Sequence, residues 1–308
     1  MTQVLKENQT LARVREEIQR RAISQGAAAK EMGVSPTTLT QLLNGTYGAD
    51  PSAQLEKLEK WLMAQVAASM QQSKLPPVPG WVSTGTAERI ISALGYAQLA
   101  GDIAIVYGGA GLGKTTANLE YQRRFPNVWI ATMTPASASV AASLEEICFA
   151  LGMKNPPQGA GRMMREVVRR VASSGGLLII DEAQHLSTAA LDTIRSIHDA
   201  TGIGIALVGN EAVYSRMTGG NMAPYLDRLF SRIGKRVRLT KPTKTDIERL
   251  ANIFGVSDED SLTWLKDIGR RAGALRSVVK VLRLATMIAK GESPSAADIE
   301  AAWKDLGV

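Results

Sequence analysis

The chain has 308 residues, a formal net charge of +7 and a sequence pI of about 9.5. Its length can hold two or three small domains, and its 45% hydrophobic and 21% charged residues are ordinary for a globular protein. The single cysteine, Cys148, excludes an intramolecular disulfide and a cysteine-rich zinc site. There is no signal peptide and no apolar run of membrane-spanning length, so we expect a cytosolic protein without a membrane partner.

Near the N-terminus, SQGAAAKEMGVSPTTLTQLLNGTY (residues 24–47) predicts two short helices joined by a turn. Gly33 suits the turn, and the second helix is expected to run from Ser35 or Pro36 to about Leu43. This pattern is typical of a helix-turn-helix, whose second helix can enter the major groove of DNA. A helical hairpin used for protein contacts is the alternative, because the second helix carries no cation. The candidate DNA contacts are Ser35, Thr37, Thr38 and Gln41.

The next stretch, SKLPPVPGW (residues 73–81), favours an extended, semi-rigid linker because it holds three prolines and a glycine. From about residue 84 to 240, apolar runs alternate with helical patterns. That alternation predicts an α/β domain with a parallel sheet and helices on both faces. The predicted strands are IAIVY (103–107), NVWIAT (127–132), GLLII (176–180) and GIALVG (204–209).

The motif GGAGLGKT (residues 108–115) lies between the first predicted strand and a predicted helix. Its glycines let several backbone N–H groups point at phosphates, and the helix N-terminus adds partial positive charge. Lys114 can reach the β- and γ-phosphates, and Thr115 can offer its hydroxyl to Mg²⁺. We therefore expect a nucleotide triphosphate here. The expected binding residues are Gly108, Gly109, Ala110, Gly111, Leu112, Gly113, Lys114, Thr115 and Thr116.

A second element, GGLLIIDEAQHL (residues 175–186), has the form of a fully buried parallel strand that ends in two carboxylates. Asp181 at the strand end can hold the Mg²⁺ shell, and Glu182 can orient and polarise the attacking water. A strand that ends in a solvated acidic turn is the alternative. Downstream of a phosphate loop, the hydrolytic interpretation is favoured.

Further polar residues follow the later predicted elements. Asn210, at the tip of the fourth predicted strand, is a sensor candidate that could position the water; alternatively, it only starts a turn. In RLFSRIGKR (228–236), Arg228 and Arg232 are four residues apart and are expected to share a helical face. Either could be an arginine finger on a neighbouring subunit's γ-phosphate, or could contact DNA or only aid solubility. Arg276 opens a predicted C-terminal helix and could reach back to the nucleotide, or be a plain surface arginine.

The order of these motifs resembles an AAA+ ATPase. The phosphate loop comes first, followed by the strand that ends in Asp181 and Glu182 and by the strand that ends at Asn210. The predicted helix with Arg228 and Arg232 and the predicted helix that Arg276 opens come last. TPASAS (134–139), LVGNEAVYSRMTGGN (207–221) and RLFSRIGKR further resemble the Mu B family of phage transposition proteins. The resemblance covers essentially the whole chain. It implies four segments: a helix-turn-helix domain (1–72), a Pro-rich linker (73–83), an AAA+ core (84–242) and a C-terminal helical lid (243–308).

The resemblance implies an ATPase that binds ATP and Mg²⁺, forms helical filaments on double-stranded DNA and delivers that DNA to a transposase in the host cytoplasm. The transposase would in turn stimulate hydrolysis. Carried over by motif, Lys114 and Thr115 would hold phosphate and Mg²⁺, and Asp181 and Glu182 would serve metal and water. Asn210 would sense the γ-phosphate, Arg276 would be the lid sensor, and the finger stays open between Arg228 and Arg232.

Charge supports a polyanionic partner. Residues 228–244 contain seven Lys or Arg and no Asp or Glu, which suggests nucleic acid, although a solvated basic face is the alternative. In GRMMREVVRR (161–170), three arginines fall on one side of a predicted helix. If that helix faced the axis of a filament, they would bind DNA phosphates independently of sequence; a solvated helix face is the alternative. The three arginines are Arg162, Arg165 and Arg169.

Two other functions compete with this interpretation. One is a transcription regulator whose helix-turn-helix reads an operator and whose ATPase domain is a switch. The basic C-terminal third of the chain argues against it, because a pure switch needs no such patch. The other is a helicase loader of the same ATPase class, for which the sequence offers little support.

Overall fold

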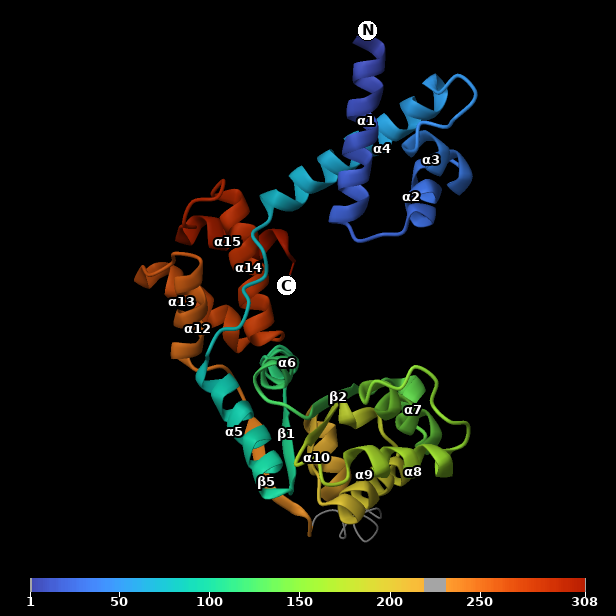
Figure 1. The fold of residues 1–308 in the computed structure, drawn as a ribbon. Helices are drawn as coiled ribbons and strands as arrows, with labels where there is room; N and C mark the ends of the chain where they lie inside the picture. The colour runs from blue at the N-terminus through green and yellow to red at the C-terminus, as the bar shows by residue number, and fades with distance from the viewer. Residues whose placement is uncertain (1, 219–230, 308) are drawn as a thin grey trace. The chain divides into compact units, whose positions relative to one another are not determined.

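The computed structural model describes residues 2–218 and 231–307. The chain forms two compact units, residues 1–76 and 77–308 (Figure 1). No helix in these described stretches has both the length and the apolar character needed to cross a membrane.

The first unit is helical, and its short helices are set by local capping. Ser24 accepts a hydrogen bond from the Ala27 amide and Ser35 accepts one from the Thr38 amide, while Gly33 ends the first short helix in the left-handed region (φ +67°). The two predicted helices are therefore confirmed. A common apolar core that includes Leu39 joins all four helices. They are α1 (Thr2–Arg20), α2 (Gln25–Met32), α3 (Pro36–Leu43) and α4 (Ser52–Lys74).

The second unit contains a parallel sheet with the strand order β2-β3-β4-β1-β5. All four predicted apolar runs are strands, and three of them are buried along their whole length. Burial is complete because helices cover both faces of the sheet. The strands are β1 (Ile103–Gly108), β2 (Val128–Thr132), β3 (Leu177–Asp181), β4 (Gly204–Gly209) and β5 (Ile233–Leu239).

Strand β5 was not expected, because residues 228–236 had been predicted as a helix. That prediction is wrong from residue 231 onward, where a turn leads into the strand. The fifth strand lies at the edge of the sheet, with Val237 and Leu239 buried and the alternating Arg236 and Arg238 exposed. This period of two is the strand signal. The alternation was obscured in the sequence because β5 is rich in Lys and Arg, which a strand at the edge of a sheet tolerates.

Successive side chains of β1 to β4 enter two different apolar cores. Ile105 of β1 packs in a core with α7, α8 and α9, and its neighbour Val106 packs in a second core with α5 and α6. Figure 1 shows α7, α8 and α9 gathered together, with α5 lying apart from them. The layered arrangement predicted from the sequence is thus confirmed. The helices are α5 (Gly85–Ala100), α6 (Lys114–Arg124), α7 (Val140–Ala150), α8 (Ala160–Val171), α9 (Thr188–Thr201) and α10 (Glu211–Thr218), with short 3-10 turns η1 (Pro135–Ser137) and η2 (Ala183–His185).

The last four described helices form a bundle with an apolar core of its own. The bundle is tied to the first turn of α5 by the buried carboxylate of Asp246. Its Oδ1 accepts a hydrogen bond from the Gly85 amide (2.6 Å) and its Oδ2 accepts one from the Thr86 hydroxyl (2.7 Å). The helices are α12 (Lys244–Ile253), α13 (Glu259–Arg270), α14 (Ala274–Ile288) and α15 (Ala296–Asp305).

Replacing Asp246 by Ala is expected to lower the free energy of unfolding by about 2–4 kcal/mol, because buried donors lose their acceptor. Asp258→Ala is the control: it removes an exposed helix cap from α13 and should cost about 1 kcal/mol. Urea unfolding of both variants measures the difference. Equal losses would mean that the buried carboxylate adds nothing beyond capping.

Asp246 also predicts a pH dependence. Burial raises the pKa of its carboxyl, but the hydrogen bonds from Thr86, Thr243 and Gly85 outweigh burial and leave the pKa below its ordinary value. A lowered folded-state pKa stabilises the fold above the unfolded pKa, and this stabilisation is lost as the pH falls toward the folded value. We therefore expect acid to destabilise the natural chain more steeply than Asp246→Asn below about pH 4. Melting curves from pH 3 to 7 test this, and parallel pH profiles would contradict it.

Candidate nucleotide-binding and hydrolysis site

The phosphate loop joins β1 to α6, and two of its glycines are needed for close backbone approaches. Gly108 (φ +153°) and Gly111 (φ +79°) both adopt conformations that L side chains rarely adopt. A Cβ at residue 108 would overlap the backbone carbonyl of Leu239 on β5, and one at residue 111 would overlap the carbonyl of Gly273 before α14. The glycine pattern thus brings the loop against both the sheet edge and the C-terminal bundle.

Lys114 begins α6 and folds over the loop. Its Nζ donates to the carbonyl oxygens of Gly108 (2.9 Å) and Gly109 (2.8 Å). Burial lowers the pKa of Lys114, whereas Glu182 and Asp181 act in the opposite direction. A partly desolvated cation beside a loop of glycines suits a ligand that carries concentrated negative charge, as a triphosphate does.

The two predicted metal ligands meet directly. The Thr115 hydroxyl donates to Asp181 Oδ2 (2.8 Å), and the Asp181 side chain is 1% exposed at the end of β3. Carboxylate and hydroxyl oxygens suit Mg²⁺, which keeps waters and substrate phosphates as its other ligands. In the described part of the chain, no cluster of three or more His, Cys, Asp or Glu forms a self-sufficient metal site. The donor set therefore fits a metal that arrives with the nucleotide.

Glu182 follows Asp181 and lines a cavity beside the phosphate loop. Its backbone is in the left-handed region (φ +53°), an uncommon conformation for a residue with a side chain. Its amide donates to Asp181 Oδ1 (3.0 Å), and its carboxylate accepts a hydrogen bond from the Gln184 side chain. The turn thus directs the Asp181 carboxylate to the Thr115 hydroxyl and places Glu182 at the cavity.

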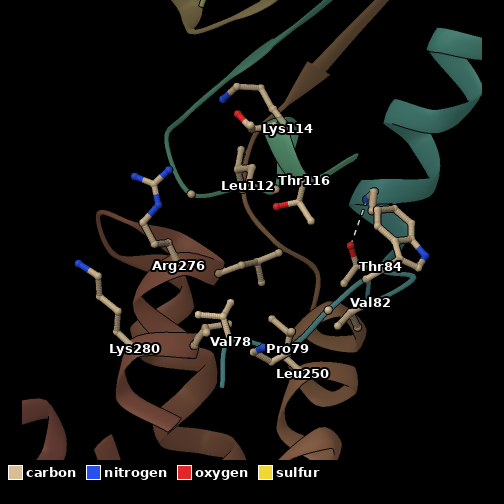
Figure 2. Close-up of a pocket in the computed structure, with 18 of the residues that line it drawn as sticks. Val78, Pro79, Val82, Thr84, Leu112, Lys114, Thr116, Leu250, Arg276 and Lys280 are labelled. Carbon is tan, nitrogen blue, oxygen red and sulfur yellow. Dashed lines mark hydrogen bonds between the residues drawn. The ribbon is translucent and has the colours of Figure 1, made fainter. Parts of the chain in front are cut away.

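The cavity has a volume of about 460 Å³ and lies between the phosphate loop and the C-terminal bundle. Figure 2 shows Lys114 and Thr116 on one side of it and Leu250, Arg276 and Lys280 on the bundle side. Polar and cationic groups thus surround one end, and apolar side chains line the rest, as a nucleotide requires. The apolar lining includes Val78, Pro79, Trp81, Val82, Ala87, Ala110, Leu112, Leu250, Leu275 and Val279.

The Arg276 prediction agrees with this geometry. Arg276 lies in the first turn of α14 and lines the cavity, and its backbone N–H donates to the Gly111 carbonyl (3.3 Å). Lys280 and Arg283 line the cavity from the next turns of the same helix. Sequence reasoning missed both, although their i+4 and i+7 spacing from Arg276 was available as a signal.

The proline-containing segment has a second role that was also missed. It was predicted only as a linker, yet residues 78–82 line the cavity. Trp81 anchors it, with the Arg124 guanidinium of α6 5.2 Å from the ring centroid. The available signal was the apolar residues Val78, Trp81 and Val82 among and just after the prolines, because a solvated linker needs none.

Asn210 directly follows β4, but its side chain already forms a hydrogen bond within the chain. Its Oδ1 accepts a hydrogen bond from the Ala212 amide (2.8 Å) at the start of α10, which agrees with the simpler interpretation of a turn-starting residue. Asn210 is exposed and does not line the cavity. A sensor role for Asn210 therefore requires this cap to be released.

The two finger candidates do not form the predicted pair on one helix. Arg228 lies outside the described residues. Arg232 lies in the turn before β5, where its Nε donates to Asp199 Oδ1 (3.2 Å). Arg232 is exposed and does not line the cavity of its own chain.

The arginines proposed for DNA share one exposed face of α8. Arg169 pairs with Glu166 (2.6 Å), and hydrogen bonds from Arg169 and Arg170 lower the pKa of Glu166 to about 2. Among the described residues, neither Arg162 nor Arg165 forms a recorded ion pair. The face therefore keeps a net positive charge.

The candidates on α3 differ in their availability. Ser35 and Thr38 bond to each other (2.8 Å) and Ser35 caps the helix. Thr37 and Gln41 are exposed. Capping thus explains part of the polar pattern that had suggested DNA contact.

Comparison with known proteins identifies two matching families and several relatives. Residues 231–306 match the family described as "Mu B transposition protein, C terminal", and residues 99–217 match the "AAA domain" family. The chain is 39% identical to "ATP-dependent target DNA activator B" of Escherichia phage Mu over 280 residues, which is 90% of this chain and 88% of the relative. The protein of the same name from Escherichia phage D108 gives the same identity and coverage.

A third relative comes from a bacterial genome. "Mu-like prophage FluMu DNA transposition protein B" of Haemophilus influenzae is 35% identical over 257 residues, 82% of this chain and 88% of the relative. The AAA domain, the parallel sheet and the site at its edge make the chain an α/β ATPase. With the relatives covering most of its length, the chain belongs to the Mu B family of phage transposition proteins.

Proposed function

We propose that this chain is an ATP- and Mg²⁺-dependent ATPase that binds double-stranded DNA without sequence specificity, forms helical filaments on it and delivers it to a transposase in the host cytoplasm. One observation carries the proposal: the phosphate loop, Glu182 and the cations of α14 line one cavity, so a bound nucleotide touches both the sheet and the bundle. The names of the relatives, ATP-dependent activators of target DNA, supply the process.

Within one subunit, Lys114 binds the β- and γ-phosphates, and Thr115 and Asp181 would hold Mg²⁺. When bound, the metal would neutralise charge that builds up on the phosphates. Glu182 orients the attacking water and accepts its proton. Asn210 senses the γ-phosphate, and Arg276 brings the C-terminal bundle, acting as a lid, onto the nucleotide. The Gly111 carbonyl already accepts the Arg276 amide hydrogen, which supports this closure.

Between subunits, we propose that Arg228 or Arg232 completes the site of a neighbour. Arg232 is exposed and is not among the residues that line the cavity of its own chain, which supports a role in trans. ATP would then join subunits, and hydrolysis would separate them. Many weak phosphate contacts add along such a polymer, so DNA affinity rises with assembly.

For DNA itself, we propose that the α8 face supplies phosphate contacts and that Thr37, Thr38 and Gln41 of a helix-turn-helix add contacts from the first unit. The net positive charge of α8 supports the first, and the exposure of Thr37 and Gln41 supports the second. Because phosphates repeat identically along any duplex, such contacts carry no sequence preference.

Electron microscopy of the purified chain with random-sequence duplex DNA tests the proposal. We expect filaments with ATP and none with ADP. A small, discrete complex that ignores ATP and needs one DNA sequence would instead identify a transcription regulator. Deleting residues 1–75 further distinguishes a filament-forming ATPase from a transcription regulator. The filament former should keep most of its DNA binding, whereas the regulator should lose it.

A charge reversal on α8 tests the DNA surface. Changing Arg162, Arg165 and Arg169 to Glu is expected to weaken DNA binding and to reduce the slope of log affinity against log salt by about 3, since each lost phosphate contact contributes about 0.9. Fluorescence anisotropy at several salt concentrations measures both. An equal charge change at Lys154, Lys290 and Lys304, which are exposed on other elements, is the control. Equal losses in the two triple variants would show that net charge, not α8, governs binding.

A further inference from the structure

Gln184, in the η2 turn that follows the Asp181-Glu182 pair, joins two parts of the proposed hydrolytic machinery. Its Nε2 donates to Glu182 Oε2, and its Oε1 accepts the backbone N–H of Asn210 (3.2 Å). One amide therefore links the carboxylate proposed to activate water with the tip of β4. Neither the phosphate loop nor the DE pattern gave this residue a role.

The orientation of this amide is determined by its two partners. A carboxylate accepts hydrogen bonds and a backbone N–H donates one, so a flipped amide would face repulsion at both ends. Packing adds a second restraint. A Cβ on Gly209 would overlap Gln184 Oε1, so the last residue of β4 admits the amide only because it is glycine.

The contact between Gln184 and Asn210 also involves the helix that follows β4. The Asn210 side chain caps α10 through the Ala212 amide (2.8 Å), so the backbone that bonds to Gln184 also begins this helix. A shift of Asn210 toward a γ-phosphate would break or bend the contact at its own backbone N–H. The Gln184 side chain would then pass that movement to Glu182.

Glu182 depends on such support because its backbone is held in an uncommon conformation (φ +53°). The Gln184 amide donates to its Oε2. In the described part of the chain, no hydrogen bond to Oε1 is seen, so Oε1 is the less restricted acceptor for a water. Each carboxylate oxygen can accept more than one hydrogen bond, so the amide restrains the orientation of the carboxylate without blocking either oxygen.

We propose that Gln184 is a positioning residue for ATP hydrolysis, which couples the β4 tip to the orientation of the Glu182 carboxylate. This inference rests on the proposed role of Glu182 as the group that activates water. Gln184 does not line the nucleotide cavity, so it acts on the rate of the chemical step through Glu182 and not on nucleotide affinity.

The test uses the full chain and the Gln184→Met variant, because Met keeps the side-chain length without either hydrogen bond. We expect kcat for ATP hydrolysis to fall about 10- to 100-fold, the cost typical of misorienting a reacting group, with KM for ATP unchanged. Gln98→Met is the matched control. The Gln98 amide likewise bridges two groups: its Nε2 donates to the Pro126 carbonyl (3.1 Å), and its Oε1 accepts a hydrogen bond from the Tyr121 hydroxyl (2.8 Å). Losing the two hydrogen bonds of Gln98 in Gln98→Met should leave kcat for ATP hydrolysis unchanged.

A double-mutant cycle distinguishes positioning from a purely structural effect. In single-turnover assays, Gln184→Met should slow hydrolysis much less in a Glu182→Gln background than in the natural chain, because the group that it positions is already disabled. Full additivity, or a natural kcat for Gln184→Met while Glu182→Gln is inactive, would overturn this inference and leave the role of Glu182 standing. Normal hydrolysis by Glu182→Gln would instead overturn the role of Glu182 itself.

Discussion

Glu182→Gln is expected to bind ATP like the natural chain but to hydrolyse it about 10²- to 10⁴-fold more slowly, the range typical of losing a general base. The amide keeps the size of the side chain and removes the group that accepts a proton from water. Lys114 and the Thr115–Asp181 pair are unchanged, so the phosphates and the metal are still held. Filaments on DNA should therefore assemble with ATP and persist, because the subunit boundary is no longer broken.

Two measurements check this expectation: single-turnover hydrolysis of labelled ATP, and light scattering of filaments after ATP is depleted. Glu145→Gln is the control, because Glu145 is exposed on α7 and does not line the cavity. It should hydrolyse ATP and release DNA normally. If Glu182→Gln disassembled at the natural rate, Glu182 would not activate water and hydrolysis would need another base.

Gly111→Ala is expected to lower ATP affinity by about 10²-fold or more. The added Cβ would overlap the Gly273 carbonyl, so the loop or α14 must move and the hydrogen bond from the Arg276 amide to the Gly111 carbonyl is lost. Since the nucleotide cavity lies between these two elements, separating them removes one wall of the site. Overlap with backbone costs more than overlap with a flexible side chain, because no rotamer change relieves it.

Gly113→Ala is the matched control for this prediction. Gly113 has nearly the same backbone angle (φ +81° against +79°), but a Cβ there meets no atom within 4 Å. Its left-handed strain, about 1–2 kcal/mol, is present with and without nucleotide, so ATP affinity should fall less than in Gly111→Ala. Isothermal titration with a slowly hydrolysed ATP analogue measures both variants. Equal losses would mean that backbone strain, and not contact with the C-terminal bundle, explains the glycine at 111.

The sequence by itself determined the parts of this protein that depend on local patterns. Four apolar runs gave β1 to β4, because a strand buried on both faces has few polar positions. Gly33 and Ser35 gave the helix ends of the first unit through conformation and capping. The phosphate loop was found in the same way, since its spacing is set by how closely backbone can approach phosphate.

The tertiary structure decided what distant segments do together. Basic residues obscured the period of two in β5, because the strand is at the sheet edge and half of its side chains face water. The segment at residues 78–82 became a cavity wall, and Gly111 proved to be required by the Gly273 carbonyl. The bridge formed by Gln184 likewise depends on two neighbouring strand ends. Local patterns report the conformation of a segment, whereas these contacts depend on how remote segments pack, and packing leaves no fixed spacing in the sequence.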